Sequence, residues 1–245
     1  MRQFLEMQLS VKNKKSVLGR DNLMRPKPSS QEKKKFEEER ARRILMYLFP
    51  DEYENTILSE SPDIISFDKD IGVEVTNGLA SHVQEALSRA CDITGKTDGE
   101  LTEINRRNIE MRGITAKPLS GKYIAGVAIW GDQYDIEGAY KKKLIKLNTS
   151  HFTRCNKNNL FIIAMLMDDD ELYSGINKII ALDKSLYNIL FDNVYIFTQN
   201  YIIVINVATD NICKYSIRAE VLSQISESTF ITIMGMSKNE YYKKE

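Results

Sequence analysis

Apolar residues recur along the chain with two different spacings. Helical spacing predicts helices over about residues 31–48, 80–91, 98–111, 135–147 and 176–190. Alternating or continuous runs rich in Ile and Val predict strands over about residues 63–68, 71–76, 160–167, 193–197 and 201–207. Residues 123–130 form a further apolar segment, either a strand or irregular. This order predicts an α/β protein with a mixed central β-sheet flanked by helices.

The first predicted helix has a recognisable start and a defined buried face. Ser29 or Ser30 is placed to cap it, and Pro50 follows its end. Its apolar face consists of Ala41, Ile44, Leu45 and Leu48. Three consecutive glutamates precede this face. Helical spacing places Glu37 on the buried face, Glu38 at its edge and Glu39 pointing away.

The predicted helix over residues 135–147 carries a similar stripe, made of Ile136, Tyr140, Leu144 and Leu147. Lys143 lies one residue from the centre of this stripe. Lys141, Lys142 and Lys146 are expected to be more exposed. Lys143 is therefore the lysine of this helix best placed to reach into the fold, although a lysine at a helix boundary often extends its amine into solvent instead.

The segment SPDIISFDKDIGVEVT predicts a β-hairpin with Lys69 and Asp70 in its turn. Asp63 opens the first strand, and Glu74 lies near the end of the second, so the two carboxylates are expected side by side. Glu74 alternates with Val73 and Val75 and should face the opposite side of the sheet. Two converging carboxylates suit a divalent cation such as Mg²⁺, which prefers oxygen ligands and takes few of them from protein.

The charge of the whole chain indicates no class of partner, and only the N-terminal region has a distinctive charge. Lys plus Arg and Asp plus Glu both number 34, so the net charge indicates no partner. Residues 1–43 nevertheless contain 13 Lys or Arg against 6 Asp or Glu. We expect residues 1–30 to form a polar, basic arm, which either stays solvated or contacts a phosphate backbone. Three widely spaced cysteines and the lack of a signal-peptide pattern favour the cytoplasm, with no membrane partner.

The hairpin resembles the core motif of the PD-(D/E)xK nuclease superfamily, which has the restriction-endonuclease-like fold. Pro62 and Asp63 match the Pro-Asp of the motif, and Glu74 matches the acidic residue of the following strand. The family often adds a glutamate from the preceding helix, for which Glu37 or Glu38 is placed. The resemblance covers roughly residues 31–207, and it implies a nuclease-like domain over residues 31–245 with a restriction-endonuclease-like core.

One position departs from the family motif. The family lysine two residues after the acid is Thr76 here. Some family members supply this lysine from another element, and Lys143 is the candidate. Without a lysine at the site, the domain would be an inactive relative.

The resemblance implies metal-dependent hydrolysis of phosphodiester bonds. Glu37, Asp63 and Glu74 would hold Mg²⁺ or Mn²⁺, and Lys143 would offset charge in the transition state. Nucleic acid is the expected partner, DNA before RNA, in restriction or another defence. DNA-cutting relatives often form homodimers. The alternative is a catalytically inactive domain of the same fold that binds nucleic acid or a protein.

Overall fold

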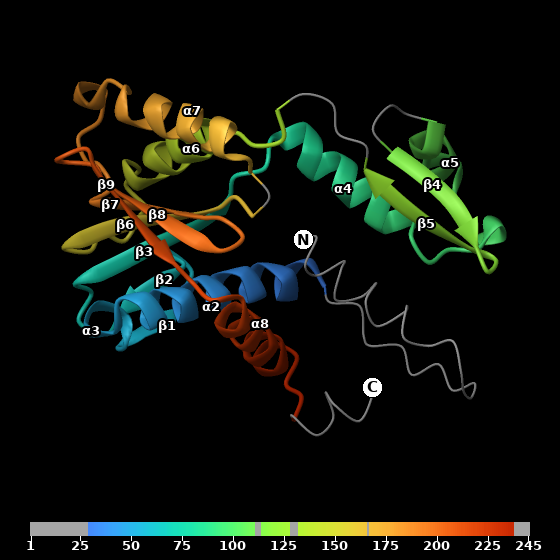
Figure 1. Cartoon of the computed structure of the whole chain (residues 1–245), viewed down its shortest axis with the longest axis horizontal. Coiled ribbons are helices and arrows are strands. Elements are labelled where there is room, and N and C mark those ends of the chain that lie inside the picture. The colour runs from blue at the N-terminus through green and yellow to red at the C-terminus, as the bar shows by residue number, and fades with distance from the viewer. Residues whose placement is uncertain (1–28, 111–113, 128–131, 166, 238–245) are drawn as a thin grey trace.

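A computed structural model of the chain describes residues 29–110, 114–127, 132–165 and 167–237. The predicted basic arm, residues 1–30, lies almost entirely outside the described residues. Within them, a mixed seven-stranded sheet is covered by helices on both faces (Figure 1). This confirms the predicted α/β class with a mixed central sheet. None of the helices in the described ranges is long and apolar enough to cross a membrane.

The main sheet combines antiparallel edges with a parallel centre. In spatial order its strands are β1 (Thr56–Leu58), β2 (Ile64–Ser66), β3 (Ile71–Asn77), β6 (Lys157–Ile163), β7 (Asn193–Phe197), β8 (Tyr201–Asn206) and β9 (Asn211–Ser216). The first three form an antiparallel meander. β3, β6 and β7 are parallel, and the last two strands return antiparallel.

The helices form two layers, one on each face of the sheet. Below it in Figure 1 lie α2 (Ser30–Leu48) and α8 (Ala219–Ile233), and above it lie α6 (Ile136–Leu147) and α7 (Asp169–Ile180). A one-turn helix, α3 (Pro50–Tyr53), follows α2. Strand β6 serves both layers, because side chains alternate along a strand. Leu160 and Ile162 pack toward α6 and α7, and Phe161 and Ile163 pack toward α2.

Most predicted elements are present, with shifts at their ends. Ser29 caps α2, and Glu32 bonds back to complete a capping box. The first hairpin strand is shorter than predicted, because residues 67–70 form the turn, with Lys69 at a positive φ of 62°. The helix predicted over residues 176–190 instead begins at Asp169. Asp168 caps that start by accepting a hydrogen bond from Glu171 N–H.

An insert between β3 and α6 protrudes from one end of the sheet (Figure 1). Its elements are α4 (Ser81–Ile93), the 3₁₀ turn Asp98–Glu100, α5 (Glu103–Glu110), β4 (Ile114–Leu119) and β5 (Lys122–Val127). The two strands pair only with each other in the described chain. Ile93, Leu101 and Ile114 give the insert a small core of its own.

Candidate functional site

The two predicted acids lie side by side where the meander meets the parallel strands. Ile64 pairs with Val73, so the residues just beyond this pair, Asp63 and Glu74, are neighbours across the hairpin. The backbone N–H of Val75 donates to Asp63 Oδ2 at 2.8 Å, which fixes the Asp63 side chain. Both carboxylates are almost completely buried. The fold therefore places two ionisable acids where they need positive charge to offset desolvation.

Lysines from α6 supply much of that charge. Lys143 Nζ lies 2.5 Å from Glu74 Oε2 and 3.7 Å from Asp63 Oδ2. Lys146, one helical turn further on, donates to Glu74 Oε1 and Oε2 at 2.8 and 2.9 Å. Lys143 therefore reaches the acidic pair, as predicted, and its catalytic role stays a prediction. Lys146 was expected to be more exposed than Lys143, and it is, with side chains 41% and 17% exposed. It still reaches Glu74, because a spacing of three places both lysines on one helix face.

The α2 helix approaches the same pair from the opposite layer. Lys34 Nζ lies 3.2 Å from Glu38 Oε1 and 3.6 Å from Asp63 Oδ1. Glu38 Oε1 is buried, and the ion pair with Lys34 offsets its charge. Burial raises the pKa of Glu38 to about 7, and repulsion from Asp63 adds to this effect while Lys34 opposes it.

The glutamate of α2 nearest the pair is Glu38 rather than Glu37. Glu37 is half-buried and acts electrostatically on Arg40, with no contact to either acid among those described. The proposed metal ligand Glu37 is therefore replaced by Glu38 as the candidate. The face of a helix that points to a sheet depends on how the helix crosses it, and α2 crosses so that its predicted edge residue meets Asp63.

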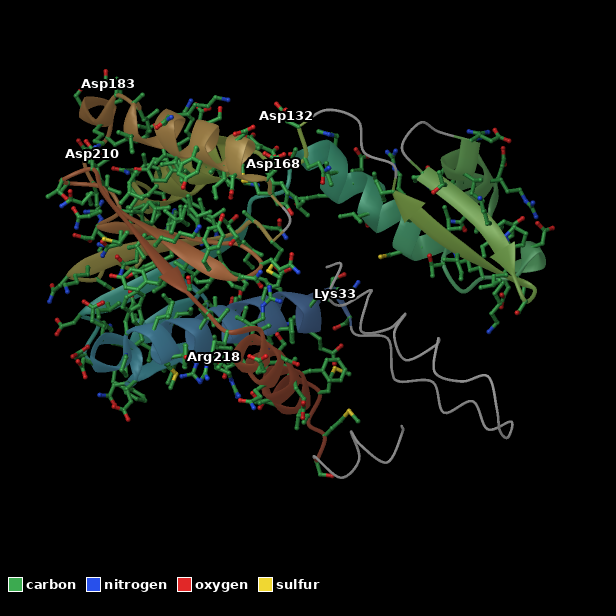
Figure 2. All side chains as sticks on the ribbon, in the orientation of Figure 1. Lys33, Asp132, Asp168, Asp183, Asp210 and Arg218 are labelled. Carbon is green, nitrogen blue, oxygen red and sulfur yellow. The ribbon has the colours of Figure 1, made fainter. Side chains whose placement is uncertain are left out.

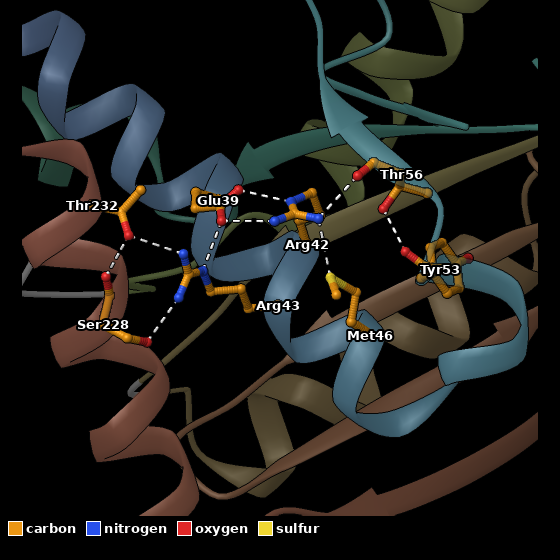
Figure 3. Close-up of polar contacts among 8 residues, drawn as sticks. All are labelled: Glu39, Arg42, Arg43, Met46, Tyr53, Thr56, Ser228 and Thr232. Carbon is orange, nitrogen blue, oxygen red and sulfur yellow. Dashed lines mark hydrogen bonds and ion pairs between the residues drawn. The ribbon is translucent and has the colours of Figure 1, made fainter. Parts of the chain in front are cut away.

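Glu39 was predicted to point into solvent, and that prediction is wrong. It is buried and accepts hydrogen bonds from both Arg42 and Arg43 (Figure 3). Arg43 in turn donates to Ser228 Oγ and Thr232 Oγ1 of α8 at 2.9 and 3.0 Å. Glu39 thus organises the contact between α2 and the last helix, a helix that the sequence pattern did not predict. Its role is structural.

The chemistry of the donors suits a hard divalent cation. Asp63 and Glu74 offer carboxylate oxygens, and a single ammonium, Lys143 Nζ, already contacts both. Glu38 Oε1 adds a buried oxygen without a hydrogen bond. No group of three or more His, Cys, Asp or Glu side chains in the described ranges is arranged to hold a metal ion. The donor set therefore fits a cation that takes two protein carboxylates rather than a complete protein cage.

A second acidic region lies apart from this pair. A pocket of about 380 Å³ between α6 and α7 is lined by Asp132, Tyr134, Asp135, Ile136, Glu137, Met167, Asp168, Asp170, Glu171, Ser174, Gly175 and Lys178. Figure 2 labels Asp132 and Asp168 where the chain returning from the insert meets the start of α7. Several of its acids are already engaged, since Asp135 and Asp168 cap helices and Glu171 accepts from Tyr134 N–H. Asp135 and Asp168 therefore stabilise the N-termini of α6 and α7, and Glu171 holds the segment that precedes α6.

No family model, curated protein or solved structure matches this chain.

Proposed function

We propose that this protein is a metal-dependent nuclease that hydrolyses phosphodiester bonds, with DNA as the favoured substrate. The observation that carries the proposal is the contact of Lys143 with both Asp63 and Glu74. Lys143 comes from a separate helix, 69 residues after Glu74. A lysine beside two carboxylates is the arrangement that the PD-(D/E)xK motif requires, and here Lys143 takes the place left by Thr76.

The order of elements also supports the family. Helix α2 is followed by the antiparallel meander β1–β2–β3, and α6 then leads into β6, which is parallel to β3. The family core has this helix, strands and flanking helix. We propose a restriction-endonuclease-like core with the insert added between β3 and α6.

Each residue has a defined part in the proposed mechanism. Asp63 and Glu74, with Glu38 near them, would hold Mg²⁺ or Mn²⁺, whose chemistry there would be activation of a water and polarisation of the phosphate. The N–H of Val75 keeps Asp63 oriented. Lys143 offers its ammonium to the negative charge that develops on the phosphate. The burial of both acids strengthens these interactions, because few water molecules screen them.

A non-catalytic domain of the same fold is the second candidate. It is favoured by one observation, namely that Lys143 and Lys146 together already satisfy both oxygens of Glu74. In that case the network is purely structural, and the surface binds nucleic acid or a protein without cutting.

Cleavage assays separate the two candidates. We expect the full chain to cut plasmid DNA, or failing that RNA, with Mg²⁺ or Mn²⁺, and EDTA to stop it. Asp63→Asn should lower the rate about 100-fold or more, because it removes a charged ligand. Asp51→Asn, an exposed acid on α3, is the matched control and should cut normally. Equal rates for both variants would refute the site, and no cutting of either substrate would favour the non-catalytic domain.

Glu38 gives a prediction that concerns stability rather than cleavage. Its pKa is about 7 in the folded chain, and the ordinary value is 4.5. The folded state therefore binds the proton more tightly than the unfolded state does. Glu38 contributes stability that is fully present below pH 4.5 and is lost as the pH rises through 7, with its pKa set by burial, Asp63 and Lys34.

Glu38→Gln should remove the loss of stability that accompanies ionisation of Glu38 above pH 7. In EDTA at pH 8, we expect it to raise the free energy of unfolding by about 1 kcal/mol or more relative to the unmodified chain, and to change little at pH 5. Urea denaturation at both pH values measures the difference. A variant that is equally destabilised at pH 5 and pH 8 would contradict the raised pKa.

A further inference from the structure

The carboxylates of the site are already balanced by lysines. Lys34, Lys143 and Lys146 face Glu38, Asp63 and Glu74, so three ammonium groups meet three acids when Glu38 is ionised. A divalent cation added to this arrangement would leave an excess of two positive charges in a partly buried place. Such an excess is costly, because like charges at short range repel strongly outside bulk water. One lysine must give way for the cation to bind.

Exposure and contact geometry single out Lys146. The side chain of Lys143 is only 17% exposed and touches both acids, whereas that of Lys146 is 41% exposed and touches only Glu74. Lys34 is 63% exposed, but it reaches Asp63 only at 3.6 Å. Lys146 donates to both oxygens of Glu74 at 2.8 and 2.9 Å, and these are the oxygens that a cation would use.

We propose that Lys146 is a displaceable counter-ion that competes with the divalent cation for Glu74. In the metal-free protein its ammonium occupies both carboxylate oxygens of Glu74. When the cation binds, the Lys146 side chain moves away from Glu74 into solvent. The ring of Phe152, whose centroid lies 5.6 Å from Lys146 Nζ, flanks the ammonium while it is paired with Glu74. This inference rests on the proposed function, since it presupposes a metal at Asp63 and Glu74.

Metal affinity tests the competition directly. Titration of the full chain with MnCl₂, without nucleic acid, should give a dissociation constant that falls about threefold to fivefold in Lys146→Gln, the effect of one partly exposed ion pair. Lys142→Gln is the matched control, because Lys142 is an exposed lysine of the same helix. It should leave the Mn²⁺ affinity unchanged.

A second measurement uses the unmodified chain and does not depend on the variant folding. Binding effects are reciprocal, so the cation must weaken the Lys146–Glu74 pair as much as the pair weakens the cation. Acetylation followed by mass spectrometry should therefore modify Lys146 about threefold faster in saturating Mn²⁺ than in EDTA. The rate at Lys142 should be the same in both.

The outcomes distinguish this inference from the proposed function. If the unmodified chain binds Mn²⁺ and Lys146→Gln binds it with equal or weaker affinity, and labelling of Lys146 is unchanged, the counter-ion role is refuted and the metal site stands. If neither protein binds Mn²⁺, both proposals fail. Tighter binding in Lys146→Gln together with faster labelling in Mn²⁺ supports the exchange.

Discussion

Replacement of Glu74 by Gln should abolish metal-dependent cleavage. We expect a fall of about 100- to 1,000-fold or more, because Gln keeps the shape of the side chain and removes the charge that a cation requires. Glu74 is fully buried and contacts two lysines, so the change leaves Lys146 without an acid and leaves Lys143 with Asp63 alone. A gel assay of plasmid cleavage under saturating Mg²⁺ measures the rate.

The effect on chemistry must be separated from an effect on folding. Glu74→Gln should cost about 1–3 kcal/mol of stability, because hydrogen-bonded charged groups lose their partner. A chain of this size tolerates such a loss and should keep its circular dichroism spectrum at 25 °C. Mn²⁺ binding should disappear in the same variant. Glu54→Gln, an exposed glutamate after α3, is the control. A folded Glu74→Gln protein that cuts at the normal rate would remove Glu74 from the site.

Leu144→Ala should produce a large loss of stability in helix α6. Leu144 is completely buried in the core between α6, α7 and the sheet. Its truncation should lower the free energy of unfolding by about 3 kcal/mol, because it removes apolar contacts and leaves a cavity. For a domain of this length, that corresponds to about 2–4 °C in Tm for each kcal/mol. Thermal unfolding followed by circular dichroism measures the shift.

The neighbouring residue provides the matched control. Ile145 is 59% exposed on the other face of the same helix, so Ile145→Ala should change stability by about 0.5 kcal/mol or less. Similar losses for the two variants would contradict the packing of α6. The comparison also concerns the site, because Leu144 lies on α6 between Lys143 and Lys146, the two lysines that contact Glu74.

Regular periodicity is what made the buried faces predictable. The stripe Ile136, Tyr140, Leu144 and Leu147 is entirely buried, as its helical spacing indicated. Alternation along β3 likewise placed Glu74 opposite Val73 and Val75. The two valines pack toward α2, and Glu74 meets lysines of α6. In these elements one local pattern determines which side of the chain faces the core, so the sequence was sufficient.

Contacts between distant elements account for what the sequence did not reveal. The identity of the α2 glutamate near Asp63 depends on the angle at which α2 crosses the sheet, which no local spacing encodes. Glu39 is buried beneath Arg42 and Arg43, and Arg43 is held by hydrogen bonds to α8, which lies about 185 residues later in the chain. The helix itself was missed because its sequence, AEVLSQISESTFITI, mixes β-branched and polar residues. In the insert, β5 falls largely within the apolar segment over residues 123–130, predicted as a strand or irregular, and only its partner β4 was not predicted.

The narrow base of the insert has a consequence for how this fold can vary. The backbone N–H of Asp135 donates to Gly78 C=O, that of Ala80 donates to Gln133 C=O, and Leu79 forms a β-bridge with Tyr134. These bonds hold the two ends of the insert together at its root. A longer insert therefore costs the sheet little, because the entropy of closing a loop rises only slowly with its length, by about 0.6 kcal/mol for each doubling. We therefore expect a shorter or longer segment in this position to leave the hairpin that holds Asp63 and Glu74 unchanged.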